Sequence, residues 1–322
     1  MAMTAAVIGL GRIGIGYDIN LSRSKFVLSH AGALNVCPET NLIAGVDISN
    51  SRRNTFRKLY SAQTFNSVAE LLNHLRPDLI VLSTDTETLI TLANEVLNTY
   101  SPKIILIEKP ISLNIELVEN LIIRCEALGV KLFVNYTRRS SPAFENVKNL
   151  ISNNTFMGPF VGTGWYTNGI LNNGSHLLNL LEYFFGEIED FSNARKIKAR
   201  AQDCDLQVNV KFRNCEIILQ PLPIDNYSTF KFDLFGVNGQ LSLGPGFEGF
   251  TWVEAEFDKV HPDLRTLSGS KTQIDSDMQF AQLHVVESLV GKMRGTNQNL
   301  CTGREGLSTL RNLIAMIESA GV

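Results

Sequence analysis

Short apolar runs of strand length alternate with amphipathic stretches from residue 4 to about residue 136. The runs fall at residues 5–10, 42–47, 63–65, 79–83, 104–108 and 131–135. Between them, residues 67–75 and 112–128 carry apolar side chains at helical spacing, the second with Ser112 as its expected N-cap and Gly129 as its stop. This alternation predicts β-α-β units around a doubly wound parallel sheet of six strands.

The pattern changes after residue 139, where strand-like runs follow one another without helices between them. We expect strands at 206–212, 215–219, 229–235 and 250–257, and helices at 277–293 and 303–319. Asn214 and residues 236–239 supply turns, so this sheet is predicted to be large, open and mostly antiparallel. The 322-residue chain, roughly twice the size of a typical domain, is expected to form an α/β domain, residues 1–136, and an α+β domain, residues 137–322.

Composition excludes several classes of partner and site. The formal net charge is −3 and the charges are spread along the chain, so nucleic acid is not expected as a partner. No run approaches the ~18 apolar residues of a membrane span, and the apolar start lacks the basic residues of a secretion signal. The five cysteines form no Cys-x-x-Cys pair and the histidines lack metal-ligand spacing, so we expect no metal and a soluble, cytoplasmic protein.

A glycine motif directly follows the first predicted strand. Gly9, Gly11 and Gly14 form the pattern G-x-G-x-x-G between a strand and a helix. The first glycine permits a tight turn, the second lets the backbone approach a pyrophosphate, and the third allows close packing. The N–H groups at the start of the helix attract the anion. A Rossmann-type dinucleotide site is the prediction, and the alternative is a turn with no ligand.

Asp47 ends the second predicted strand and favours NAD over NADP. Its carboxylate can accept hydrogen bonds from the adenosine ribose hydroxyls and would repel a 2′-phosphate. Arg52 and Arg53 follow closely and leave NADP as the alternative. Asp47 lies further from the glycines than the usual spacing of ~20 residues, which predicts an insertion after Gly14.

Two residues could carry chemistry. Lys109 follows the apolar run 104–107, at the carboxyl end of a parallel strand, where open α/β sheets bind their ligands. His176 begins an apolar helix that Gly186 ends. The alternatives are a solvated lysine at a strand end and a buried core histidine. Tyr166 could likewise form a wall for a sugar ring or belong to the core.

Several separated motifs together resemble one family, the glucose-fructose oxidoreductase, inositol dehydrogenase and rhizopine-catabolism (Gfo/Idh/MocA) oxidoreductases. They are GLGRIG at 9–14, GVD at 45–47, EKP at 108–110, NYTRRSSPAF at 135–144, NNGSHLLNLL at 172–181 and CTGREGL at 301–307. The resemblance implies a Rossmann domain, and a second domain whose open sheet often forms the interface of a homo-oligomer, here a dimer or tetramer. It also implies substrates that are sugars, polyols or nucleotide-linked sugars.

By the same resemblance, Lys109 matches the active-site lysine of the family and His176 its catalytic histidine, and the Lys109–Pro110 bond is expected to be cis. The sequence departs from the family at two positions, because Asn172 and Asn179 stand where aspartates are common. An amide can orient a hydroxyl group but cannot hold a proton.

We therefore expect an NAD(P)-dependent dehydrogenase that acts on CH–OH groups, with His176 as the acid–base, Lys109 as the stabiliser of negative charge and Asn172 as the orienting group. The expected cofactor contacts are Gly9, Gly11, Arg12, Ile13, Gly14, Asp47, Ser83, Thr84, Glu108 and Lys109. The expected substrate contacts are Lys109, Arg138, Tyr166, Asn172 and His176. The alternatives are a non-catalytic NAD-binding sensor or subunit and a redox-neutral NAD-dependent glycosidase.

Overall fold

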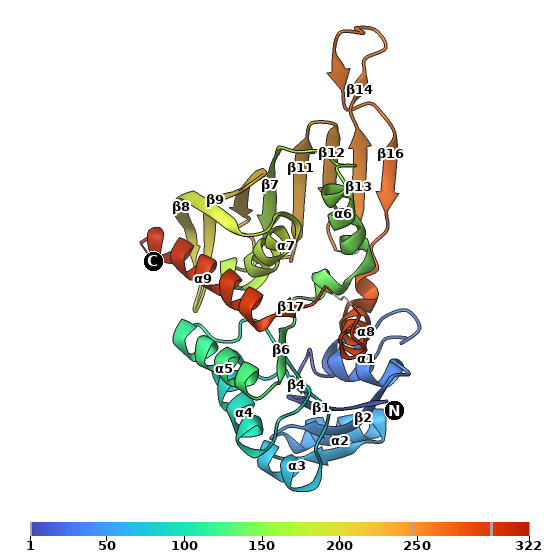
Figure 1. The fold of residues 1–322 in the computed structure, drawn as a ribbon, viewed down its shortest axis with the longest axis vertical. Coiled ribbons are helices and arrows are strands. Elements are labelled where there is room, and N and C mark those ends of the chain that lie inside the picture. The colour runs from blue at the N-terminus through green and yellow to red at the C-terminus, as the bar shows by residue number, and fades with distance from the viewer. Residues whose placement is uncertain (1, 247, 297–298, 322) are drawn as a thin grey trace. The chain divides into compact units, whose positions relative to one another are not determined.

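The computed structural model describes residues 2–246, 248–296 and 299–321, and they form two compact units (Figure 1). The first unit contains Met1–Ser141 and Gln279–Ser308, and the second contains Pro142–Met278 and Thr309–Val322. This division differs from the single boundary after residue 136 that the sequence predicts. Residues 279–308 return to the first unit because Val285, Val286 and Leu289 of one helix are buried in its core.

The first unit is built on a parallel sheet with the strand order of a doubly wound fold, β17-β6-β5-β4-β1-β2-β3. The six predicted strands are confirmed as β1 Met3–Ile8, β2 Thr40–Val46, β3 Gln63–Phe65, β4 Leu79–Leu82, β5 Ile104–Ile107 and β6 Lys131–Val134. A short strand that the sequence did not predict, β17 Cys301–Thr302, pairs antiparallel with β6. All residues of β4 and β5 are buried, as their unbroken apolar runs require.

Helices pack against this sheet. They are α1 His30–Val36, α2 Asn50–Tyr60, α3 Val68–His74, α4 Thr86–Thr99, α5 Ile115–Ala127 and α8 Ala281–Met293. The predicted cap of α5 was wrong: Asn114, not Ser112, accepts the hydrogen bond from Leu117 N, at 3.1 Å. Ser112 instead accepts from the backbone N–H of Asn114, so it orders the turn before the helix. Gly129 follows α5 with φ of +68°, as expected for a helix stop.

The second unit is built on an eight-stranded sheet of order β16-β13-β12-β11-β7-β10-β9-β8. Its strands are β7 Phe160–Tyr166, β8 Ile188–Ala199, β9 Cys204–Phe212, β10 Cys215–Pro221, β11 Phe230–Gly236, β12 Gly239–Leu243, β13 Phe250–Glu254 and β16 Lys271–Ile274. Neighbouring strands are antiparallel except for β7 and β10, which confirms the predicted class of sheet. A separate hairpin joins β14 Glu256–Phe257 and β15 Arg265–Thr266.

Three helices supply the apolar groups that cover one face of this sheet: α6 Pro142–Ser152, α7 Ser175–Phe185 and the later part of α9 Gly303–Ser319. Their buried side chains, such as Phe144, Leu177 and Met316, join the inward-facing residues of the strands in one core. Alternate residues of the strands point to the other face, where Val161 of β7 and Phe235 of β11 are exposed.

Tyr166 is a core residue of this unit, so the structure does not support its predicted contact with substrate. Its side chain is fully buried. Its hydroxyl donates to Leu206 O at 2.5 Å and accepts from Leu206 N at 2.9 Å, and burial raises the pKa of the phenol. The hydroxyl therefore satisfies two backbone groups of the neighbouring chain segment.

We expect Tyr166→Phe to destabilise the second unit by about 1–3 kcal/mol, because both backbone groups of Leu206 lose a partner in the core. Urea unfolding followed by tryptophan fluorescence measures this, since Trp165 and Trp252 both belong to this unit. Tyr227→Phe, at a position 54% exposed, is the control and is expected to change little. Equal unfolding midpoints for the two variants would contradict the assigned role.

Candidate functional site

The three glycines form the predicted turn after β1, and two of them are required by the backbone itself. Gly9 has φ of +97°, and a Cβ atom there would lie 2.6 Å from Ser83 O. A Cβ atom on Gly14 would lie 2.1 Å from Gly9 O. A Cβ atom on Gly11 would meet no atom within 4 Å. Gly9 and Gly14 therefore make the turn, whereas Gly11 leaves its backbone open to a ligand.

The insertion predicted after Gly14 is looped out of a helix. The first helical turn is closed by the bond from Ile15 N to Gly11 O, at 3.0 Å. The chain then leaves, and residues 18–29 form what we call the inserted loop. Helical hydrogen bonding resumes on the far side of this loop, because His30 N donates to Ile13 O and Ala31 N to Gly14 O, both at 3.0 Å. The helix α1 thus continues the turn that the glycines begin.

Asp18 closes the neck of the inserted loop. It is only 3% exposed. Its Oδ1 accepts from Ser29 Oγ at 2.6 Å, and its Oδ2 accepts from the backbone N–H groups of Leu28 and Ser29, both at 3.0 Å. A buried carboxylate with three hydrogen bonds joins the two ends of the loop. No sequence motif indicates this role for Asp18.

A cavity of about 650 Å³ lies at the carboxyl ends of β1, β2 and β4. Seven of the predicted cofactor residues line it, namely Gly9, Gly11, Arg12, Ile13, Asp47, Ser83 and Thr84. Gly14 is buried within the turn, and Glu108 and Lys109 follow β5 and are not among the lining residues. Tyr17 also lines the cavity, with the Arg12 guanidinium 5.1 Å from its ring centroid. No sequence motif indicates this role for Tyr17.

Asp47 lies buried at the end of β2, next to the glycine turn. Its Oδ2 accepts from Leu10 N and its Oδ1 from Ser49 N, both at 2.8 Å. Arg52 lies 3.4 Å from the same carboxylate. Arg53 donates to the backbone oxygens of Asp47 and Ile48, at 2.6 and 3.0 Å. Arg53 is therefore engaged by the chain's own carbonyl groups.

The end of β5 brings Glu108, Lys109 and Pro110 to the same edge of the sheet. The Lys109–Pro110 peptide bond is cis, as expected. Both Glu108 and Lys109 are half-buried. Glu108 Oε1 lies 2.8 Å from His30 Nε2 and 2.6 Å from Asn135 Nδ2. Arg138, in the short helix η2 Thr137–Ser140, is half-buried as well.

In the second unit, Asn172 and His176 share a tight helical segment. Asn172 lies in the π-helical turn Ile170–Gly174, and His176 lies in the first turn of α7. Asp203 accepts hydrogen bonds from the backbone N–H groups of Leu171, at 3.0 Å, and Asn172, at 3.2 Å. Burial raises the pKa of this carboxyl group. Asp203 therefore holds the turn that contains Asn172. No sequence motif indicates this role for Asp203.

Asn179, the second departure from the family pattern, has a structural role. It is 1% exposed, and its amide donates to Thr309 Oγ1 at 2.9 Å. This residue therefore lies in the core of the second unit.

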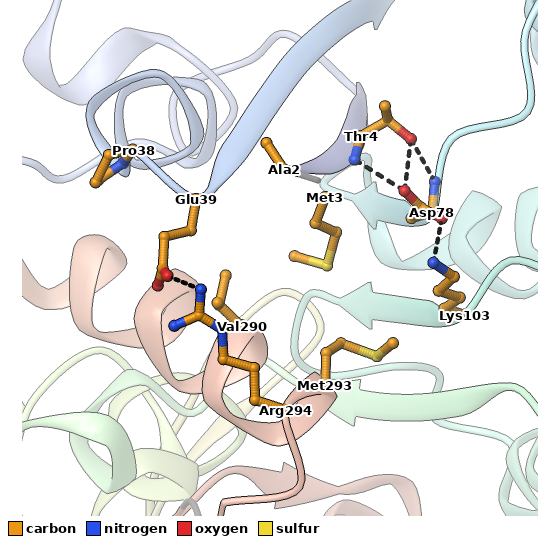
Figure 2. A pocket seen from close by; sticks show the side chains of 10 residues that line it. All are labelled: Ala2, Met3, Thr4, Pro38, Glu39, Asp78, Lys103, Val290, Met293 and Arg294. Carbon is orange, nitrogen blue, oxygen red and sulfur yellow. Dashed lines mark hydrogen bonds and ion pairs between the residues drawn. The ribbon is translucent and has the colours of Figure 1, made fainter.

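A second cavity, of about 750 Å³, lies at the amino ends of the strands (Figure 2). Its charged side chains pair with one another: Lys103 lies 2.8 Å from Asp78, and Arg294 forms an ion pair with Glu39. Thr4 donates to Asp78 from both its backbone and its hydroxyl group. Because open α/β sheets bind ligands at the carboxyl ends of their strands, the cavity beside the glycine turn is the candidate site.

Two further properties concern the described residues alone. Within residues 2–246, 248–296 and 299–321, no group of three His, Cys, Asp or Glu side chains is placed to hold a metal ion. No helix in the same part of the chain is long and apolar enough to cross a membrane.

Gly11→Ala is expected to fold normally and to bind NAD at least ~10-fold more weakly, because its methyl group would occupy the space that a pyrophosphate needs. Gly14→Ala is the matched comparison, and there the methyl group meets Gly9 O and destabilises the first unit itself. Thermal unfolding and calorimetric titration with NAD separate the two effects. Native affinity in Gly11→Ala would contradict this placement of the pyrophosphate.

Known proteins resemble the chain in sequence and in fold. Residues 3–136 match the model of the Gfo/Idh/MocA family, described as an oxidoreductase family with an NAD-binding Rossmann fold. The myo-inositol 2-dehydrogenase of Thermotoga maritima is 28% identical over 160 residues, which are 49% of this chain and 43% of that relative. The match thus spans less than half of the relative's length.

Two solved structures share the fold over the whole chain. The WlbA dehydrogenase from Bordetella pertussis, in complex with NADH and UDP-GlcNAcA, has a TM-score of 0.75 at 19% identity and covers 100% of this chain and 96% of its own. An oxidoreductase from Agrobacterium radiobacter, in complex with NAD⁺, L-tartaric acid and magnesium, has a TM-score of 0.75 at 16% identity. The match covers 100% of this chain and 97% of that protein's chain. Residues 3–136 therefore match the Gfo/Idh/MocA oxidoreductase family over its NAD-binding Rossmann fold, which confirms the resemblance found in the sequence for this part of the chain.

Proposed function

We propose that this chain is an NAD-dependent dehydrogenase that transfers a hydride between the nicotinamide and a carbinol carbon of a sugar, a polyol or a nucleotide-linked sugar. The observation that carries the proposal is the cavity beside the glycine turn, which is lined by Asp47 and by Gly11, whose backbone is open to a ligand. Relatives that act on inositol or hold a UDP-sugar support the substrate class. The first unit would be the cofactor domain and the second the domain for substrate and oligomerisation.

Asp47 supports NAD as the cofactor. Its carboxylate oxygens each accept one backbone hydrogen bond and keep lone pairs for the ribose hydroxyls. A 2′-phosphate at this place would meet a buried negative charge. Two arginines lie close enough in the sequence to form an ion pair with that phosphate. Arg53 donates hydrogen bonds to backbone oxygens, and Arg52 lies against the Asp47 carboxylate. The local charge therefore favours a free 2′-hydroxyl.

The residues of the chain have distinct proposed roles in the reaction. When bound, NAD supplies the hydride acceptor. His176 takes the hydroxyl proton as a general base and returns it in the reverse direction. Lys109 donates a hydrogen bond to a substrate oxygen and stabilises the negative charge that develops there. Asn172 orients the substrate through its amide, and its turn is held by Asp203.

Asn172 also favours a second candidate function, a sensor that binds NAD and a sugar without turnover. An amide carries no charge and cannot hold a proton, as the aspartate common at this position in the family could. NAD binding with no turnover on any sugar class would favour the sensor.

The remaining proposals concern assembly and location. The uncovered face of the second sheet exposes Val161, Ile218 and Phe235, which are 56%, 37% and 41% exposed. We propose that a second copy of the chain covers this face, in a dimer or tetramer. All five cysteines are free and buried, which supports a reducing compartment such as the cytoplasm.

Lys109→Ala and His176→Ala are each expected to lower kcat at least ~100-fold, because each removes a group that acts on the reacting oxygen. NAD affinity should stay near the native value. Lys103→Ala is the matched control, since Lys103 precedes the amino end of the same strand and should leave turnover unchanged. Steady-state NADH formation measures all three. Native kcat in either active-site variant would remove that residue from the mechanism.

Asp47→Ser is expected to lower the preference for NAD over NADP at least ~10-fold, since it removes both the acceptor for the ribose hydroxyls and the charge that repels the phosphate. Titration of each cofactor against the native protein and the variant gives this ratio. Equal weakening of NAD and NADP would show that Asp47 serves the turn alone.

A further inference from the structure

A buried cluster of polar side chains lies behind the carboxyl end of β5, in the first unit. Its members are His30 at the start of α1, Glu108 after β5, Asn135 after β6 and Gln282 in α8. His30 is 1% exposed, and Asn135 and Gln282 are each 3% exposed. Glu108 Oε1 is the acceptor for both His30 Nε2, at 2.8 Å, and Asn135 Nδ2, at 2.6 Å. The Asn135 amide also reaches Gln282 Oε1, at 3.4 Å.

The charge state of Glu108 follows from these contacts. Burial raises the pKa of its carboxyl group, but the hydrogen bonds from His30 and Asn135 and the charges of His30 and Lys109 outweigh burial and lower it. An ionised carboxylate accepts hydrogen bonds and donates none, so His30 carries a proton on Nε2 and donates it to Glu108. The histidine therefore acts on Glu108 as a fixed donor.

The two oxygens of Glu108 differ. Both of the hydrogen bonds to its side chain go to Oε1, and among the residues that the structure describes none goes to Oε2. The side chain is 15% exposed. One oxygen is thus held from behind while the other keeps its lone pairs for a group at the carboxyl edge of the sheet.

The buried polar cluster around Glu108 does not serve stability alone. Within the described part of the chain, His30 Nδ1 and Asn135 Oδ1 are buried without a hydrogen-bond partner. Unpaired buried polar atoms lower stability, and in native proteins they call for another explanation. Fixing the carboxylate of Glu108 is such an explanation.

The strand order places Glu108 on the nicotinamide side of the fold. A doubly wound sheet binds the two halves of a dinucleotide on either side of its first strand. Asp47 follows β2 on one side of β1, whereas Glu108 follows β5, beyond β4 on the other side. The adenosine half belongs with Asp47, so the second half belongs with the strands that include β5.

We propose that His30 is a positioning residue, which holds Glu108 so that its second carboxylate oxygen accepts hydrogen bonds from the ribose hydroxyls of the nicotinamide half. This inference rests on the proposed binding of NAD. The inserted loop separates His30 from the glycine turn in sequence, but the bond from His30 N to Ile13 O returns it to the same helix. One helix start therefore serves the pyrophosphate through Gly11 and the nicotinamide half through His30.

The test compares NAD with ADP, which lacks the nicotinamide half. His30→Leu is expected to weaken NAD about 10-fold or more, through the loss of a charge-assisted hydrogen bond, and to change ADP affinity less than about 2-fold. His30→Gln, whose amide nitrogen can donate to Oε1, should restore most of the NAD affinity. His74→Leu, at an exposed position of α3, is the matched control and should change neither affinity. Calorimetric titration measures all four proteins.

A double-mutant cycle tests whether His30 acts through Glu108. In a Glu108→Gln background, His30→Leu is expected to cause little further loss of NAD affinity. Equal weakening of NAD and ADP by His30→Leu, or the same loss with and without Glu108→Gln, would overturn the inference. If the native protein binds NAD no more tightly than ADP, the proposed function fails together with it. If the native protein discriminates and His30→Leu does not alter the discrimination, the inference about His30 alone fails.

Discussion

The geometry of the first unit depends on two backbone hydrogen bonds, from His30 N to Ile13 O and from Ala31 N to Gly14 O. They rejoin a helix that the inserted loop interrupts. Without them the glycine turn would end in a single helical turn, and its N–H groups would have no continuous helix behind them. Asp18 closes the neck of the loop and keeps the two ends in register. The insertion therefore adds a surface segment without displacing the dinucleotide site.

The same constraint connects the two ends of the site. The first turn of the helix places Gly11 beside the cavity. His30, which continues the same helix after the inserted loop, forms a hydrogen bond with Glu108 at the end of β5. Two carboxylates, Asp47 and Glu108, then stand on opposite sides of β1, each held by fixed hydrogen-bond donors. Such preorganised acceptors suit the two riboses of a dinucleotide, because one ribose is bound on each side of the first strand of a doubly wound sheet.

The sequence predicted the parts whose physics is local. The buried strands of the parallel sheet have unbroken apolar runs, the glycines mark a turn that Cβ atoms would block, and the long spacing to Asp47 indicated the insertion. Other features have no local signal. β8 is largely polar and irregularly paired, so its alternation is weak. The contact of His30 with Glu108 joins residues 78 positions apart. The sequence left Tyr166 open between a wall for a sugar ring and a core residue, because the bond of its hydroxyl to Leu206 O joins residues that are distant in the chain.

The most direct test of the account is transfer of deuterium from substrate carbon to cofactor. The purified protein would be incubated with NAD and polyols, free sugars or nucleotide-linked sugars that carry deuterium on their carbinol carbons, and the NADH formed would be analysed by mass spectrometry. The account predicts that one of these classes yields NADH that carries the label. Tight binding of NAD without labelled NADH from any class would contradict a dehydrogenase.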